Sequence, residues 1–270
     1  MSDRVFIVQS GLADCPRKSH WPAWLDLLQS GSGLILALFM WGHMFFVASI
    51  LLGATAMWSI TRMFEGYFFL GASKPWLVSG VVAGVLLVFV LHALLAVRKF
   101  PISYRQLQTL RAHVKAMRHE DSTLWLWQVY TGFALFFLAS AHLYQMLVWP
   151  QNIGPYASSD RMWSDGLWPF YLVMLLAVEL HGGIGLYRLA MKWGWPNASR
   201  EFLKKLKWAL TAFFLILGLA TLGAYMKIGF EHRAQYGERY QPEHLPNWLE
   251  RLAPPGDFAP QAEPAPEVRP

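Results

Sequence analysis

Five ionisable side chains, tyrosines aside, lie within long apolar stretches of the sequence: His43, His92, His142, Glu179 and His181. Ionisable groups are costly inside a hydrocarbon layer, and they usually serve a function there. A single histidine of this kind can simply form a hydrogen bond between helices. Four histidines in four separate stretches indicate a shared role instead. Imidazole binds iron, zinc and copper, so the set predicts a metal-binding protein.

The histidines must be positioned by membrane-spanning helices. The sequence contains five apolar stretches, at residues 33–52, 76–97, 124–149, 167–187 and 208–226. Each is long enough to cross a hydrocarbon core of about 30 Å as a helix, and lipid offers an unpaired backbone no partner. We therefore expect an all-α integral membrane bundle of five transmembrane helices. The first helix should begin earlier, near Pro22, which places Asp26 in the headgroup region.

The basic residues give the expected orientation. Loops 98–120 and 188–207 carry six Lys or Arg residues each, whereas the two opposite loops contain only Arg62, Lys74 and Arg161. Basic loops stay on the cytoplasmic side, so the N-terminus is expected inside and the C-terminus outside. The formal charge of +6 does not indicate nucleic-acid binding, because the basic residues are confined to these loops.

Counting from the outer ends of the stretches sorts the histidines by depth. His43 and His142 form an outer pair, and His92 and His181 form an inner pair about seven residues deeper. Seven helical residues correspond to roughly 10 Å. Two imidazoles from different helices can bind one haem iron from opposite sides, since the porphyrin supplies the other four nitrogens. Zinc and copper also accept imidazole, but two separate pairs suit a four-coordinate metal poorly.

The remaining composition sets further limits. Cys15 is the only cysteine, so the sequence has no CxxCH motif and the expected haem is not covalently attached. Small residues flank the histidines and would let a macrocycle edge approach the backbone: Gly42, Ala93, Ala141, Gly182, Gly183 and Gly185. Small residues also serve ordinary helix packing in membranes. We expect a cytoplasmic segment at 1–20, the helical domain at 21–230 and an extended or disordered, Pro-rich periplasmic tail at 231–270.

Three motifs resemble a known family, the dihaem cytochrome b subunit of bacterial quinol:fumarate reductases in the succinate:quinone oxidoreductase superfamily. They are GHMFF at 42–46, RKFPI at 98–102 followed by Tyr104 and Arg105, and ELHG at 179–182 followed by GLYR at 185–188. The resemblance extends over about residues 20–230 and all five stretches. It implies two haem b groups enclosed by the bundle.

The resemblance also implies a bacterial cytoplasmic-membrane complex with a flavoprotein subunit and an iron–sulfur subunit on the cytoplasmic face. Menaquinol would be oxidised to menaquinone near the outer haem. Electrons would then pass inward to the iron–sulfur clusters and FAD, where fumarate becomes succinate. The basic loops would form the docking face, and a dimer of the whole complex is left open.

Two carboxylates acquire roles from the resemblance. Glu65, in the first outer loop, would accept protons from the quinol, although the bare sequence would place it as a solvated loop charge. Glu179 would carry a proton across the membrane to compensate the electrons, or else would pair with a buried polar group. Candidate contacts to haem propionates are Gln29, Ser30, Trp125 and Lys192 on the inner side and Arg161 on the outer side.

Other functions remain open at this stage. The same subunit could work in the opposite direction, as a succinate:menaquinone reductase, because fumarate and succinate are handled on another polypeptide. A transporter that uses the histidines as a proton relay belongs to a different class. Cytochrome bc-type subunits usually place two histidines on one helix, which this sequence never does.

Overall fold

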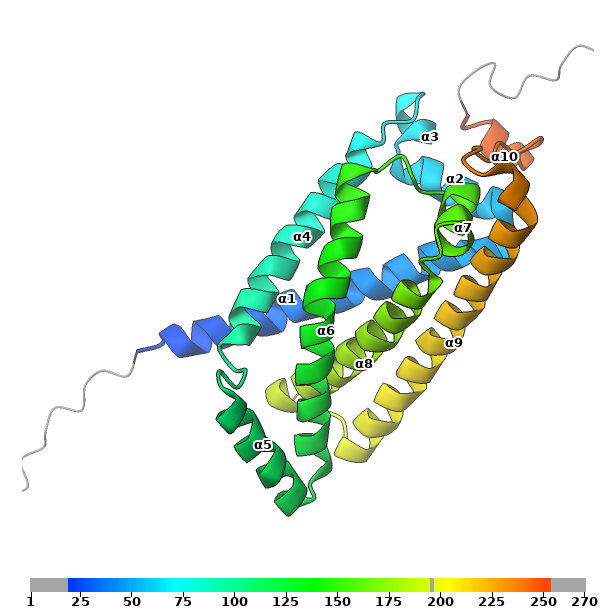
Figure 1. Cartoon of the computed structure of the whole chain (residues 1–270). Helices are drawn as coiled ribbons and strands as arrows, with labels where there is room; N and C mark the ends of the chain where they lie inside the picture. Colours follow the sequence, from blue (N-terminus) through cyan, green and yellow to red (C-terminus); the bar gives the residue numbers. More distant parts are fainter. Residues whose placement is uncertain (1–18, 195–196, 254–270) are drawn as a thin grey trace, which may run out of the picture.

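Five long helices dominate the computed structural model, which describes residues 19–194 and 197–253 (Figure 1). Within these residues five helices are long and apolar enough to cross a membrane, and no strand is present. The predicted all-α membrane bundle is therefore confirmed. The five helices are α1 (Trp21–Ala48), α4 (Trp76–Val97), α6 (Glu120–Val148), α8 (Trp168–Trp193) and α9 (Arg200–His232).

Four of these helices extend beyond the apolar stretches that predict them. Helix α1 begins at Trp21, as the apolar residues after Pro22 suggest, and α9 begins eight residues before its apolar stretch. The extra turns at the start of α6 and α9 are polar, and several of their charges are paired. Arg200 forms an ion pair with Asp121, and Lys204 Nζ lies 2.6 Å from Glu120 Oε2. These pairs join the first turns of α6 and α9.

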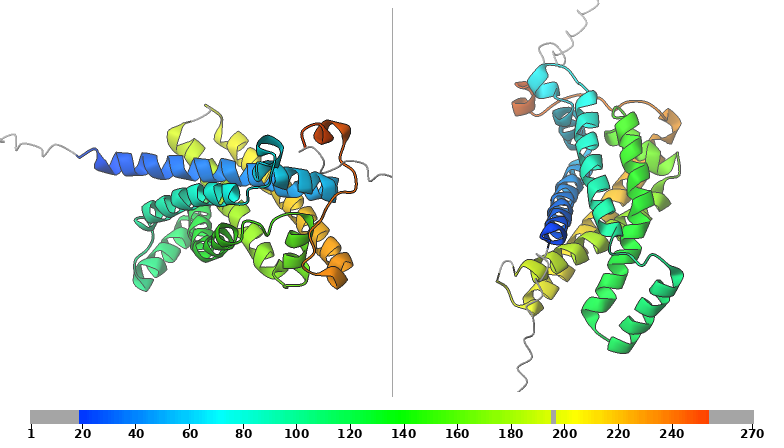
Figure 2. Two further views of the ribbon diagram at one scale, coloured as in Figure 1. Left: turned by 90° about the horizontal axis from the view of Figure 1, so that it is seen from above. Right: turned by 90° about the vertical axis from the view of Figure 1, so that its left-hand side faces the viewer.

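The long helices cross one another at clear angles, and α1 runs obliquely across α4 and α6 (Figures 1 and 2). Helix α1 contacts α4 and α8, and α6 contacts these same two helices from the other side. The four helices thus enclose a common interior. Helix α9 packs against α8, α1 and α7. Each of the four enclosing helices carries one of the four histidines, and α9 carries none of them.

Short elements close the two ends of the bundle. One end holds η1 (Ser49–Leu52), α2 (Ala54–Phe64), α3 (Tyr67–Leu70) and α7 (Pro155–Trp163), and we call it the α2–α7 end. The other end, called the basic end, contains residues 98–120, 188–194 and 197–207. Helix α5 (Tyr104–Met117) lies here beside the first half of α6, and Arg111 Nε donates to Tyr130 Oη at 2.6 Å (Figure 2).

The segment after α9 packs back onto the α2–α7 end. The chain continues helically through η2 (Arg233–Gln235), loses regular structure, and forms a last turn, α10 (Asn247–Glu250). Leu245 and Leu249 are buried against Trp58 and Tyr67. The expected tail at 231–270 thus contains helical and packed residues as far as 253. Its remainder, and most of the expected segment 1–20, lie outside the described residues.

Candidate haem and quinol site

A cavity of about 1000 Å³ occupies the space between the four histidine-bearing helices. All four histidines line it, and the rest of the lining is mainly apolar, with Val, Leu, Phe and Met side chains from α1, α4, α6 and α8. The cavity is far larger than the voids that close-packed protein interiors leave. Its size is within the range of small-molecule and cofactor sites.

His43 from α1 and His142 from α6 face each other nearest the α2–α7 end. Their ring centroids are 6.2 Å apart, and the ring planes are inclined at 80°. His142 Nδ1 lies 3.3 Å from Tyr171 Oη, and this hydroxyl donates to Gln145 Oε1 at 3.1 Å. The contact occupies Nδ1 of His142 and leaves Nε2 for another partner.

His92 from α4 and His181 from α8 form the second pair, toward the basic end. Their ring centroids are 6.4 Å apart, and the planes are inclined at 89°. His92 Nδ1 lies 3.1 Å from Ser32 Oγ, and His181 Nδ1 lies 3.1 Å from the Gln128 carbonyl oxygen. Metal-binding histidines commonly use one nitrogen for such a contact, which fixes the ring and leaves the other nitrogen for the metal.

The ring separations fit the six-coordinate haem that the sequence predicts. A metal–imidazole bond is about 2.0 Å, and the nitrogen lies about 1.1 Å from its ring centroid, so two rings on opposite sides of one metal have centroids about 6.2 Å apart. The observed values are 6.2 and 6.4 Å. Among the described residues no group of three His, Cys, Asp or Glu side chains could hold a metal ion. The donor sets are therefore pairs, as a haem bound by two histidines needs.

Two glycines make room for the inner pair. A Cβ atom on Gly33 would lie 2.9 Å from His92 Cε1, and one on Gly132 would lie 2.9 Å from His181 Cε1. Each glycine therefore lets a neighbouring helix approach the Cε1 atom of an imidazole. Gly42, which the sequence suggests for this purpose, has nothing within 4 Å of such an atom. The useful glycines lie across the helix interface from each ligand, and no sequence signal indicates that pairing.

All five candidate propionate contacts line the large cavity. Gln29, Ser30, Trp125 and Lys192 lie at the basic end, and Arg161 lies at the α2–α7 end. Gln29 Oε1 is buried without a hydrogen-bond partner among the described residues, so the amide has capacity for a further contact. Arg161 is buried and donates to the Asn152 carbonyl oxygen.

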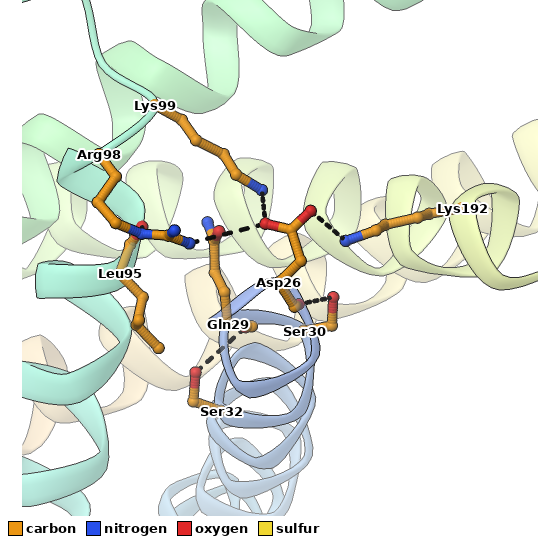
Figure 3. A network of polar contacts seen from close by, with 8 residues as sticks. All are labelled: Asp26, Gln29, Ser30, Ser32, Leu95, Arg98, Lys99 and Lys192. Atoms are coloured by element: carbon orange, nitrogen blue, oxygen red, sulfur yellow. Dashed lines mark hydrogen bonds and ion pairs between the residues drawn. The ribbon is translucent and has the colours of Figure 1, made fainter. Parts of the chain in front are cut away.

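A charged network at the basic end, centred on Asp26, was not predicted as part of the site (Figure 3). The Asp26 carboxylate lies 2.8 Å from Lys99 Nζ, 3.2 Å from Lys192 Nζ and 3.6 Å from Arg98 Nη2. Ser30 Oγ donates to the Asp26 carbonyl oxygen at 2.8 Å. Lys99 and Lys192 line the cavity, whereas Asp26 does not.

Glu65 is almost completely buried, with 2% of its surface exposed, at the end of α2. Its Oε2 lies 2.6 Å from Arg62 Nη1, and the same nitrogen donates to Ser73 Oγ at 2.8 Å. A solvated loop charge, the interpretation from residue type alone, does not describe this position. Glu65 lines a second cavity of about 180 Å³ and not the large one.

This second cavity is bounded by α2, α7 and the segment after α9. Tyr156 and Tyr240 contribute to its walls, and Tyr240 Oη lies 2.7 Å from Thr55 Oγ1. Burial, with Tyr240 and Glu238 nearby, raises the pKa of the Tyr156 phenol above its ordinary value. Ile153 lines both cavities, so residue 153 forms part of the wall between them.

Glu179 lies on the face of α8 that α9 covers. Its side chain is 1% exposed, and Oε1 has no hydrogen-bond partner among the described residues. One turn later, Gly183 lies against Thr211, because a Cβ there would be 2.4 Å from Thr211 Oγ1. Glu179 does not line the large cavity, although it is two residues from His181.

Comparison with known proteins gives consistent matches. Residues 103–221 match the family model described as succinate dehydrogenase/fumarate reductase transmembrane subunit. The fumarate reductase cytochrome b subunit of Helicobacter pylori is 54% identical over 218 residues, covering 80% of this chain and 86% of that protein. The subunit of the same name from Wolinella succinogenes is 55% identical over 227 residues, covering 82% of this chain and 89% of that protein.

Proposed function

Since the chain belongs to the succinate dehydrogenase/fumarate reductase transmembrane subunit family, as a fumarate reductase cytochrome b subunit, we propose that it oxidises menaquinol within a quinol:fumarate reductase. It is a membrane subunit of an oxidoreductase complex. The finer proposal is that menaquinol gives up its electrons near the α2–α7 end. Iron–sulfur and flavin subunits at the basic end would receive them and reduce fumarate.

The arrangement of the histidines carries this proposal. Two pairs, His43 with His142 and His92 with His181, have ring separations suited to one iron each. Haem b bound at such a pair supplies reversible one-electron transfer. Two layers at different depths would connect the two sides of the membrane, which a single layer near one surface would not do.

The chain's own residues would fix and balance these groups. Contacts at Nδ1 of His92, His142 and His181 hold the rings so that Nε2 is free to bind iron. Gln29, Ser30, Trp125 and Lys192 would hold the propionates of the inner group, and Arg161 those of the outer group. These side chains supply N–H, O–H or cationic donors at the two ends of an otherwise apolar cavity.

Glu65 would act as the proton acceptor for the quinol. A quinol loses two protons with its two electrons, and a carboxylate within hydrogen-bond reach can receive them in turn. The ion pair with Arg62 fixes the position of this carboxylate. Glu179 would transfer a proton across the bundle, and its unpaired oxygen inside the helix interface supports such a role.

The distribution of charge supports the proposed sidedness. Basic residues concentrate at the end that holds α5 and the start of α9, and such segments stay in the cytoplasm. The flavoprotein and iron–sulfur subunits would dock there, on the cytoplasmic face of a bacterial inner membrane. The α2–α7 end, with Glu65, would then face the periplasm, where released protons are carried away by water.

The decisive functional test uses the complex purified with its partner subunits. Menaquinol-driven fumarate reduction should be sustained, and an artificial donor that feeds the hydrophilic subunits should also reduce fumarate. Succinate-driven menaquinone reduction under the same conditions measures the reverse direction. A complex that reduces fumarate with the artificial donor but never with menaquinol would refute the proposed function.

A further inference from the structure

The Asp26 network places one carboxylate among several cations at the basic end of the large cavity (Figure 3). Lys99, Arg188 and Lys192 line the cavity here, and Arg98 lies beside them. Asp26 forms ion pairs with three of these cations, Arg98, Lys99 and Lys192. The mouth of the cavity therefore has an excess of positive charge, which suits a ligand with two carboxylates.

Two of the candidate propionate contacts, Gln29 and Trp125, lie close to the inner histidine layer. Ser32, the partner of His92, is three residues after Gln29 on α1. Gln128, the partner of His181, is three residues after Trp125 on α6. Gln29 and Trp125 are therefore each about one helical turn from a residue that contacts the inner histidine pair, on the side of the basic end.

Stability alone does not account for this arrangement. The side chains of Asp26, Lys99 and Lys192 are 36%, 44% and 38% exposed. Exposed ion pairs contribute little to folding, because water screens them and two long side chains must be held in place. Asp26 nevertheless gathers cations from α8 and from the end of α4 to one point. Its main effect is on where the two lysine charges lie.

We propose that Asp26 is a positioning residue, which holds Lys99 and Lys192 at the cavity mouth as counter-charges to the propionates of the group bound by His92 and His181. It thereby sets the midpoint potential of that group. The inference rests on the proposed haem ligation, and it adds a determinant of redox potential beyond the ligands and the direct propionate contacts.

The direction of the effect follows from electrostatics. Oxidised haem iron carries one more positive charge than reduced iron, so a nearby carboxylate favours the oxidised state and lowers the potential. Asp26→Asn removes that negative charge while the positive charges of the two lysines remain, so it raises the potential of the inner group. Removing a cation, as in Lys192→Gln, lowers it.

The test is a potentiometric titration of both haems in the purified complex, followed by their absorption. Asp26→Asn should raise the midpoint potential of the component assigned to His92 and His181, and leave the other component nearly unchanged. Glu120→Gln is the matched control. It removes a paired carboxylate at the same end, but its partner Lys204 does not line the cavity.

Equal shifts in Asp26→Asn and Glu120→Gln, or equal shifts of both haems, would overturn the proposal. If Asp26→Asn does not assemble, Lys99→Gln and Lys192→Gln replace it, and an unchanged inner potential in both variants would refute the inference. The titration needs neither quinol nor fumarate. If the inner potential shifts in a complex that has no quinol-driven activity, the proposed function alone is refuted. If the native complex contains no haem, the proposed function and the inference about Asp26 are both refuted.

Discussion

Each imidazole of the inner pair lies against a glycine of another helix, and this contact leads to a sharp prediction. Gly33→Ala places a methyl group 2.9 Å from His92 Cε1, so the ring must move or the helices must separate. The variant should lose the inner haem or alter its absorption, as read from reduced-minus-oxidised spectra. The outer haem should remain.

Gly31→Ala provides the control on the same helix. A Cβ at Gly31 meets nothing within 4 Å, and both substitutions favour helix formation by about 1 kcal/mol. The two variants therefore differ mainly in the contact with His92. Spectra that are native in Gly33→Ala, or altered alike in both variants, would show that the close approach has no importance for the haem.

Glu65→Gln should separate quinol oxidation from haem binding. Glutamine keeps the size and polarity of the side chain but cannot accept a proton from the quinol. We expect menaquinol-driven turnover to fall at least about 100-fold, the lower end of general-base contributions, while both haems and artificial-donor activity persist. Assays of both activities on one preparation measure this. Retention of most quinol-driven turnover in a fully haem-loaded variant would defeat the role of Glu65.

The sequence predicts the histidine layers because depth along a transmembrane helix follows directly from residue counting. It does not predict the second contacts of the ligands. Ser32 and His92 are 60 residues apart, and Gln128 and His181 are 53 apart. Such pairs depend on how the helices rotate and cross, which an apolar pattern leaves undetermined. The burial of Glu65 likewise depends on α7 and the segment after α9, which approach it only in three dimensions.

At the scale of elements, α7 and α9 approach closely through a glycine. A Cβ on Gly229 would lie 2.4 Å from the Ser159 carbonyl oxygen and 2.6 Å from Trp163 Cβ. Gly229→Ala should therefore push α7 away and destabilise the α2–α7 end by about 1–3 kcal/mol, the usual cost of overpacking. Thermal unfolding followed by haem loss would measure it as a lower transition temperature.

Gly223→Ala is the matched control, since a Cβ there meets nothing within 4 Å on the same helix. Its transition temperature should remain near the native value. A Gly229→Ala protein as stable as Gly223→Ala would mean that α7 moves aside without cost, and that the tight crossing is not needed.

The five long helices are predictable because a single long apolar stretch can cross lipid only as a helix, which pairs its own backbone groups. The polar ends of these helices are not predictable from hydropathy, because ion pairs such as Arg200 with Asp121 accompany the extension of α6 and α9 past the apolar residues. Helices α2 and α7 also escaped prediction. They lie in the connections between spans, which a search for long apolar stretches does not cover, and they pack against their neighbours.

At the scale of the whole molecule, charge distinguishes the two ends and predicts sidedness. In a Cys15→Ser background, single cysteines replace the exposed residues Ser164, after α7, and Gln108, on α5. A membrane-impermeant thiol reagent applied to intact spheroplasts should label Ser164→Cys. Gln108→Cys should react only after the membrane is opened. The reverse pattern would invert the proposed orientation and move quinol oxidation to the cytoplasmic side.

The central claim is that the chain holds two haem b groups, one on each histidine pair. It is tested most directly by haem content and redox-resolved spectra of the purified complex and its single histidine variants. We expect two haems per chain in the native protein. His43→Ala and His142→Ala should lose the same component, His92→Ala and His181→Ala the other, and His119→Ala, exposed before α6, neither. Two unchanged haems in all four ligand variants would contradict the account. So would loss of the same spectral component in His43→Ala and in His92→Ala.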